Sequence, residues 1–306
     1  MTLVTSPLAH VLQIITHKAQ GSPGTTIFTV MSSFSTSTIS DINAISEFLA
    51  CEDIATLHGC PPVDVLVFCV SAVLPIAHEV FSALETTQPK LAKTVVICGG
   101  IGHSTRLLYE AVRKNAKYQS IADQIDGLPE AAVLNLILKN FYPRLVGQIE
   151  AGAFKLLIED KSTNCGANAS ETRNLLDQHC VPLPKSVIIV QDPTMSLRTI
   201  ASFRKTYADV SPTPKFLGCP TFVPLMALDE GTSSEPHFQT SAAAYQEPEL
   251  WDHQRFFDLI MGEIPRLRDD ENGYGPKGKG FIAHVDVPGD IDAAWTRLRT
   301  ILDFKR

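Results

Sequence analysis

The stretch that decides the fold is residues 94–105, TVVICGGIGHST, where an unbroken apolar run leads into a glycine-rich turn. Apolar residues that follow one another without polar interruption are typical of a strand buried on both faces of a parallel sheet. Residues 105–114 then carry apolar side chains at helical spacing. A buried strand, a glycine turn and a helix in this order predict one unit of a doubly wound α/β fold.

The same alternation continues on both sides of this stretch. Further buried strands are predicted at 63–70, 154–159 and 186–191, and further helices at 74–84, 130–141, 169–178 and 195–207. Strands and helices that alternate in this way form right-handed crossover units. We therefore expect a Rossmann-like α/β fold with a doubly wound, mostly parallel sheet.

The alternation stops near residue 215, and the remaining sequence has a different pattern. Amphipathic helices are predicted at 250–264 and 291–302. Trp251 and Trp295 fall on their apolar faces and are expected in the core. This part of the chain is therefore predicted to be mostly helical and to pack on the sheet.

The N-terminal residues are rich in Thr and Ser and predict an irregular extension, followed by a helix that Thr38 or Ser40 caps. The predicted organisation has three parts, which are an N-terminal extension (1–37), an α/β ligand-binding domain (38–215) and a smaller, mostly helical C-terminal domain (216–306).

Composition narrows the classes of function. The 306 residues include 26 basic and 33 acidic side chains, a net charge of −7, whereas nucleic-acid binders usually carry a basic stripe. The seven cysteines form no C-x-x-C pair, which disfavours a disulfide framework or a zinc knuckle. The longest uncharged apolar run, 65–77, has 13 residues, fewer than the roughly 18–20 of a membrane-spanning helix.

From these counts, and from an N-terminal sequence without a signal-peptide pattern, we expect a cytoplasmic protein. Its expected partner is a small-molecule ligand, with no nucleic acid, no membrane and no metal. The sequence leaves the oligomeric state open.

Ligands of doubly wound folds bind at the carboxyl ends of the strands, so the residues that follow each strand are the candidate site. The glycine loop supplies Gly99, Gly100, Gly102, Ser104 and Thr105. Its glycines let the backbone approach a ligand closely, and N–H groups at a helix start attract phosphate or carboxylate. The loop lacks the third glycine of the dinucleotide fingerprint, so a tight turn without a ligand explains it equally well. His103 and Glu130 are the predicted acid–base groups.

Polar residues also follow the other predicted strands, namely Ser71, Glu159, Asp160, Ser162, Thr163, Asn164, Asn168, Gln191, Asp192 and Thr194. A carboxylate at 159 or 160 can accept hydrogen bonds from ribose hydroxyls. Turn and cap hydrogen bonds explain some of these residues, because Asn168 can cap one helix and Asp192 another. Arg198 lies about one turn further on, where it meets an anionic group or is solvated.

Together these segments resemble one family. The segments are 99–105, 158–166, 190–195, 262–270, 273–276 and 281–286, and the resemblance extends from about residue 40 to 297. They are similar to the DUF218 family, which contains SanA, ElyC and YdcF, and the matches after residue 262 single out its YdcF-like branch. Two positions depart from the family pattern, since Val70-Ser71 replaces a glycine and Leu197 stands where the family has an arginine.

The resemblance implies a nucleotide-utilising α/β fold, a helical C-terminal domain and S-adenosylmethionine as the cofactor. The leading hypothesis is an S-adenosylmethionine-binding transferase acting on an unknown small molecule. In it, the glycine loop takes the methionine carboxylate, and His103, Glu130 or Arg198 acts near the reacting centre. The alternatives are a non-catalytic sensor of the same ligand and an enzyme that acts on a phosphorylated nucleotide or sugar. The loop around 273–276 would suit closure over the site.

Overall fold

The computed structural model describes residues 34–88, 90–229, 236–239 and 249–302. These residues belong to one compact unit, 33–306. Most of the predicted N-terminal extension lies outside the described residues. The helix that follows it, α1 (Thr36–Ala50), begins one residue before the predicted end of the extension at residue 37. Its cap is Ser35, whose side chain accepts from the Thr38 backbone N–H, and not Thr38 or Ser40 as the sequence suggested.

A five-stranded parallel sheet with the order β3-β2-β1-β4-β5 forms the centre of the fold. Its strands are β1 (Val63–Cys69), β2 (Ala92–Cys98), β3 (Lys155–Glu159), β4 (Ser186–Val190) and β5 (Lys215–Gly218). The chain winds outward from β1 to β3 and then returns to β4 on the other side of β1. This confirms the predicted doubly wound α/β fold and puts the topological switch point between β1 and β4.

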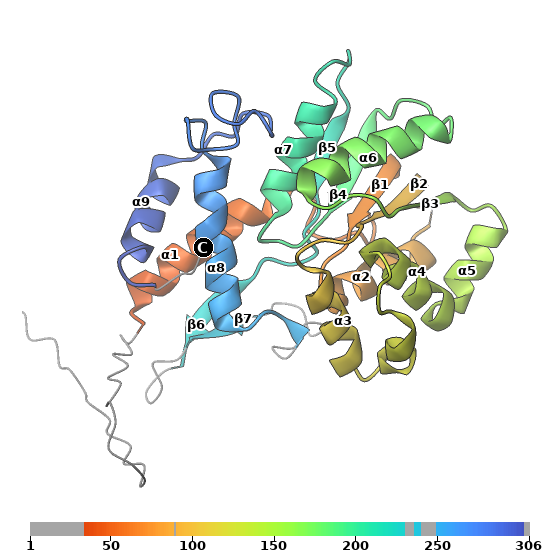
Figure 1. Ribbon diagram of the computed structural model, residues 1–306, viewed down its shortest axis with the longest axis horizontal. Coiled ribbons are helices and arrows are strands. Elements are labelled where there is room, and N and C mark those ends of the chain that lie inside the picture. The colour runs from red at the N-terminus through yellow and green to blue at the C-terminus, as the bar shows by residue number, and fades with distance from the viewer. Residues whose placement is uncertain (1–33, 89, 230–235, 240–248, 303–306) are drawn as a thin grey trace, which may run out of the picture. The chain divides into compact units, whose positions relative to one another are not determined.

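Helices cover both faces of the sheet (Figure 1). One face packs against α2 (Leu74–Thr86), α4 (Glu130–Phe141) and α5 (Pro143–Glu150), with α3 (Thr105–Lys114) and the short helix η1 (Gln119–Gln124) nearby. The other face packs against α6 (Cys165–Gln178) and α7 (Ser196–Thr206).

Successive residues of the strands enter different cores because side chains alternate across a sheet. Leu66 and Phe68 of β1 enter the core under α2, and Val65 and Val67 enter the core under α6. All four are buried, which explains why the apolar runs in the sequence are continuous.

The C-terminal part contains more β structure than the sequence predicted. The fifth strand, β5, continues the sheet at the point where the alternation was expected to stop. A two-stranded antiparallel hairpin, β6 (Leu225–Leu228) and β7 (Pro236–Gln239), follows it. The helices α8 (His253–Leu267) and α9 (Gly289–Leu298) then lie beside α1, away from the sheet (Figure 1).

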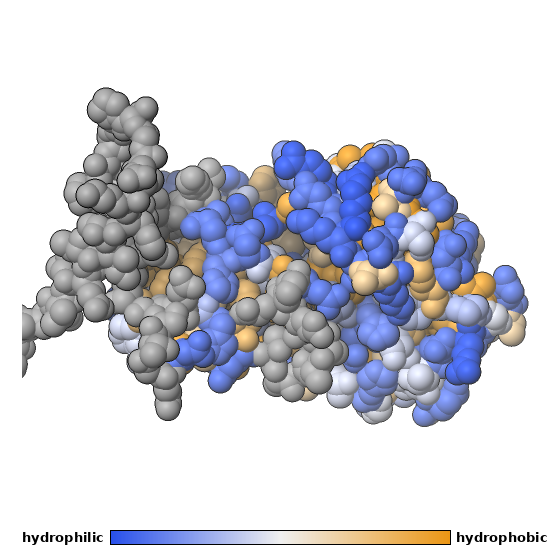
Figure 2. Space-filling view, turned by 90° about the horizontal axis from the view of Figure 1, so that it is seen from below, coloured by the Kyte–Doolittle hydropathy of each residue, from blue (hydrophilic) through white to orange (hydrophobic). Residues whose placement is uncertain are grey.

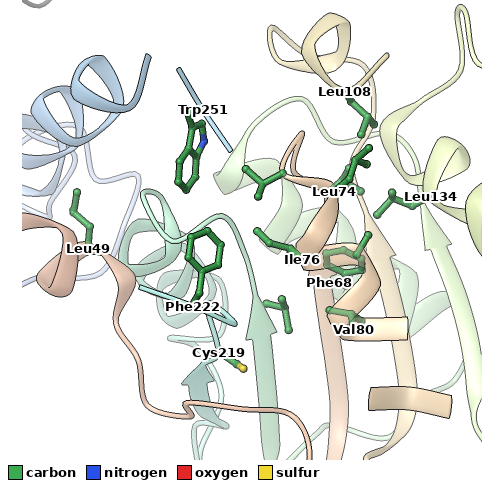
Figure 3. Close-up of a cluster of buried hydrophobic side chains, with 14 of the residues drawn as sticks. Leu49, Phe68, Leu74, Ile76, Val80, Leu108, Leu134, Cys219, Phe222 and Trp251 are labelled. Carbon is green, nitrogen blue, oxygen red and sulfur yellow. The ribbon is translucent and has the colours of Figure 1, made fainter. Parts of the chain in front are cut away.

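A cluster of aromatic side chains joins the C-terminal part to the sheet. Trp251 lies 6.0 Å from Phe222 and 5.6 Å from Phe256, measured between ring centroids. Figure 3 shows Trp251 and Phe222 between Leu49 on one side and Leu74 on the other. Trp251 is buried as expected, but α8 starts at His253, so this residue precedes the helix instead of lying on its face. Trp295 is buried on α9, as predicted.

In the part of the chain that the structure describes, no helix has both the length and the apolar character needed to cross a membrane. On the face shown in Figure 2, hydrophilic residues predominate over the described surface, with smaller groups of apolar residues between them.

Candidate functional site

The glycine loop after β2 packs directly against the loop after β3. The Gly99 N–H donates to the Glu159 carbonyl oxygen over 2.9 Å, and the Gly100 N–H donates to that of Ser162 over 2.8 Å. A Cβ on Gly100 would lie only 2.3 Å from the Ser162 carbonyl oxygen. Glycine at position 100 is therefore required by this backbone contact, whether or not a ligand also binds.

Glu130, at the start of α4, closes the glycine loop from the other side. Its backbone N–H donates to the Gly100 carbonyl oxygen over 3.1 Å. Its Oε1 atom accepts from the hydroxyls of Ser104 over 3.0 Å and Thr105 over 2.9 Å. Its Oε2 atom receives no hydrogen bond from the described residues. Burial raises the pKa of Glu130, although the two hydroxyls act to lower it.

The start of α3 completes this group. The helix begins at Thr105, as predicted, and the Thr105 hydroxyl accepts from the Gly102 N–H over 2.8 Å. His103 is exposed in the loop, and its ring makes no hydrogen bond within the described part of the chain. The structure thus brings Gly100, Glu130 and the polar residues of this loop together at the end of β2.

Of the two carboxylates predicted for a ribose, the loop after β3 presents only one to solvent. Glu159 is 3% exposed, and its Oε1 atom accepts from the backbone N–H groups of Lys161 over 2.7 Å and Ser162 over 2.8 Å. It therefore shapes the loop from inside, and the suggestion that it faces a ribose is not supported by this position. Asp160 is exposed.

The helix after this loop is capped by a different asparagine from the one the sequence suggested. Asn164 is the N-cap of α6, and its Oδ1 atom accepts from the Ala167 N–H over 3.0 Å. Asn168 lies inside the helix and is not its cap. Thr163 is exposed, whereas the Ser162 hydroxyl is buried and has no hydrogen-bond partner among the described residues.

At the switch point, Asp192 is enclosed by four hydrogen bonds. Its Oδ2 atom accepts from the Ser71 hydroxyl and the Trp251 indole N–H, both over 3.1 Å. Its Oδ1 atom accepts from the backbone N–H and the hydroxyl of Thr194, over 3.0 and 2.7 Å. Burial raises the pKa of this carboxyl, and the hydrogen bonds oppose that shift. Asp192 is not an N-cap, because α7 begins only at Ser196.

The neighbouring Gln191 is buried and bonded within its own loop. Its Oε1 atom accepts from the Asp192 N–H over 2.7 Å, and its Nε2 atom donates to the Thr199 hydroxyl over 3.3 Å. Gln191, Asp192 and Thr194 are each buried. These residues connect β4 to α7 and leave little polar surface for a ligand.

Arg198 is held by a partner that the sequence did not assign. Its guanidinium donates through Nε and Nη2 to the two carboxylate oxygens of Glu263 on α8, over 2.5 and 3.1 Å. Arg266 adds a 3.1 Å bond to the same carboxylate. The side chains of Arg198 and Glu263 are 14% and 2% exposed. Arg198 is therefore neither solvated nor free to receive an anion through that edge.

The predicted site residues thus divide into two groups. One group, at the ends of β2 and β3, has exposed loops and backbone N–H groups at a helix start. It also has two carboxylates, Glu130 and Glu159, each with one oxygen that no described residue bonds, and that of Glu159 is buried. The other, at the ends of β1 and β4, is closed by Asp192 and Trp251. Nowhere in the described ranges do three His, Cys, Asp or Glu side chains gather as metal ligands. No model of a known protein family matches the chain.

Proposed function

We propose that this protein binds S-adenosylmethionine at the glycine loop beyond β2 and transfers its methyl group to a small molecule. Two lines support the proposal, namely the resemblance to the DUF218 family and the chemistry of the first group of site residues. The observation that carries it is the contact of Glu130 with the Gly99–Thr105 loop. This contact puts a carboxylate beside the N-terminus of α3.

An amino-acid ligand matches this pair of charges. The methionine end of S-adenosylmethionine carries an ammonium and a carboxylate on the same carbon. In the proposed complex the ammonium donates to Glu130 Oε2, and the carboxylate accepts from N–H groups at the start of α3. Asp160, which is exposed, accepts from the ribose hydroxyls.

His103 is the general base of the proposed transfer. The acceptor atom forms a bond to the methyl carbon while the carbon–sulfur bond breaks, and the bonding pair stays on sulfur to give S-adenosylhomocysteine. The proton that the acceptor loses passes to the His103 ring, which is exposed beside the loop. Arg198 has no part in this proposal because Glu263 holds its guanidinium.

A non-catalytic sensor of the same ligand is the second candidate. It is favoured because Asp192 and Arg198 are buried and bond to other residues of the protein, which leaves them unable to take part in catalysis. A phosphorylated ligand without an ammonium group is less favoured, because nothing in it would offset the repulsion between its phosphate and the Glu130 carboxylate. The proposed compartment is the cytoplasm, which agrees with seven cysteines that are all free thiols.

A thermal-shift panel on the full chain tests the proposal. Its arms are S-adenosylmethionine, S-adenosylhomocysteine, methionine, ATP and inorganic phosphate. At 100 times Kd a ligand stabilises the folded state by about 2.7 kcal/mol, so the first two compounds should raise Tm clearly. A response to ATP and phosphate alone would favour the phosphorylated class. No response to either S-adenosyl compound would reject the proposal.

A further inference from the structure

A second cluster of polar side chains lies outside the strand-end loops, where α2, the segment before η1 and the start of α5 meet. Its centre is the hydroxyl of Tyr142. This oxygen lies 2.8 Å from His78 Nδ1, 2.8 Å from the Tyr118 hydroxyl and 3.1 Å from Lys117 Nζ. None of these four residues belongs to the candidate site at the strand ends.

The turn that carries Lys117 and Tyr118 is fixed by Asn115, the residue that follows α3. Its Oδ1 atom accepts from the Lys117 N–H over 2.9 Å and the Tyr118 N–H over 3.2 Å. Its Nδ2 atom donates to Glu249 over 2.9 Å. These bonds fix the backbone of the turn, and the Lys117 side chain, which is exposed, extends from it toward Tyr142.

The environment of the Lys117 amine is mostly aromatic. Nζ lies 4.4 Å from the ring centroid of Tyr142 and 5.3 Å from that of Tyr118. Within the described residues it forms no ion pair, although Glu85 is close enough to act on it electrostatically. Partial burial lowers the pKa of Lys117. This burial favours the neutral amine, which is the nucleophilic form, whereas the two rings and Glu85 favour the ammonium.

His78 supplies a base next to this amine. Its Nδ1 atom lies 3.4 Å from Lys117 Nζ and 2.8 Å from the Tyr142 hydroxyl, so the imidazole can take up a proton from the amine directly or through the phenol. Burial, followed by the Lys117 charge, lowers the pKa of His78, while Glu79 and Glu249 raise it. The ring is exposed on its other side, so a proton that it takes up can leave to solvent.

From this juxtaposition of amine, imidazole and phenol we propose that Lys117 is an acylation site, which takes acyl groups from activated donors such as acyl phosphates and acyl thioesters. The Nζ lone pair attacks the carbonyl carbon of the donor, and the new carbon–nitrogen bond replaces the carbon–oxygen or carbon–sulfur bond. The leaving group departs as phosphate or as a thiolate that then takes up a proton. The proton lost by nitrogen passes to His78 Nδ1.

The test measures the acetylation rate of each lysine by peptide mass spectrometry, with the full chain at pH 7. Acetyl phosphate and S-acetyl-N-acetylcysteamine are used in separate arms, which identify the class of donor. The reference is Lys139, which is exposed on α4 and makes no hydrogen bond within the described residues. Lys117 should react several-fold faster than Lys139 with at least one donor, and an equal or lower rate with both would overturn the proposal.

A variant of His78 tests whether the imidazole, and not the exposure of the amine alone, makes Lys117 reactive. His78→Asn should bring the Lys117 rate down toward that of Lys139 while the rates of the other lysines stay unchanged, which also shows that the fold is kept. His58→Asn is the matched control, because His58 faces Glu79 at 3.4 Å and does not contact Lys117. A Lys117 rate that His78→Asn leaves unchanged would contradict the role of the imidazole.

Discussion

Glu130 and Asp192 are both buried carboxylates at the carboxyl edge of one sheet, yet the protein uses their oxygens differently. Both oxygens of Asp192 accept two hydrogen bonds, which come from three separate segments of the chain. Glu130 accepts two bonds on Oε1 and none from the described residues on Oε2. A carboxylate at a strand end thus holds the fold together when both of its oxygens are bonded, as in Asp192. An oxygen that no described residue bonds either remains for a ligand, as we propose for Glu130, or is buried, as in Glu159.

The largest effect on stability is expected at Glu263, a third buried carboxylate, which forms ion pairs with Arg198 and Arg266. Glu263→Gln should lower the free energy of unfolding by about 3–5 kcal/mol, because Arg198 would then be buried without a counter-charge. Urea denaturation measures this loss. The control is Arg266→Gln, which removes a half-exposed pair and should cost less than about 1 kcal/mol. Equal losses in the two variants would contradict this account of the pair.

The next largest effect on stability is expected for Asp192→Ala, which removes the carboxylate that links Ser71, Thr194 and Trp251. It should lower the free energy of unfolding by about 3 kcal/mol, because donors from Ser71, Thr194 and Trp251 lose their acceptor. Trp251→Phe keeps an aromatic ring and removes a single bond to the carboxylate, so it should cost about 1.5–3 kcal/mol. Chemical denaturation of both variants gives the two values. A smaller loss of unfolding free energy in Asp192→Ala than in Trp251→Phe would contradict the role of Asp192 as the shared acceptor of these hydrogen bonds.

A smaller effect is expected where the glycine loop meets the loop after β3. Gly100→Ala should cost about 1–3 kcal/mol, because its Cβ would overlap the Ser162 and Asp160 carbonyl oxygens at 2.3 and 2.8 Å. Gly147→Ala, at a helical position with nothing within 4 Å, should instead stabilise by about 0.5–1 kcal/mol. Thermal unfolding compares the two glycines. If Gly100→Ala left the stability unchanged, the two loops would have to be able to move apart.

The smallest effect on stability is expected at Glu130. Glu130→Gln keeps an oxygen that accepts from Ser104 and Thr105, and it removes a buried charge, so the variant should be as stable as the parent at pH 7 or slightly more stable.

The stability of the parent relative to Glu130→Gln should change with pH in a defined direction. Because the folded pKa of Glu130 is raised, the folded state binds its proton at higher pH than the unfolded chain does. The parent should therefore lose stability, relative to Glu130→Gln, as pH rises from the ordinary value of a glutamate through the raised value. Urea midpoints of both proteins measured across that range test this. A difference that grows in the opposite direction would mean that the folded state favours the charged form.

Local patterns predicted the sheet domain closely and failed where elements are short. The helices at 105–114 and 130–141 begin and end where they were predicted, since their apolar spacing is regular. The strand at 215–218 and the hairpin of β6 and β7 were missed, because four residues give too short a pattern to recognise.

The candidate site could be predicted only in part, for a related reason. Residue types and the strand-end rule identified the loops, and residue type alone singled out Glu130, which the structure places against the glycine loop. They did not reveal that Trp251 bonds to Asp192, or that Glu263 pairs with Arg198, because these partners are 59 and 65 residues apart in the chain. Contacts of that kind depend on the packing of α8 and its preceding segment, which leaves no local signal.

The proposed role of Glu130 and its glycine loop in ligand binding is tested most directly by calorimetric binding of S-adenosylmethionine to the parent and to Glu130→Gln under the same conditions. The parent should bind one equivalent, and Glu130→Gln should bind at least about tenfold more weakly, a difference of about 1.4 kcal/mol, while it unfolds at the same urea concentration. Equal affinities of the two proteins, or no binding by the parent, would contradict the assignment of Glu130 and its glycine loop as the ligand site.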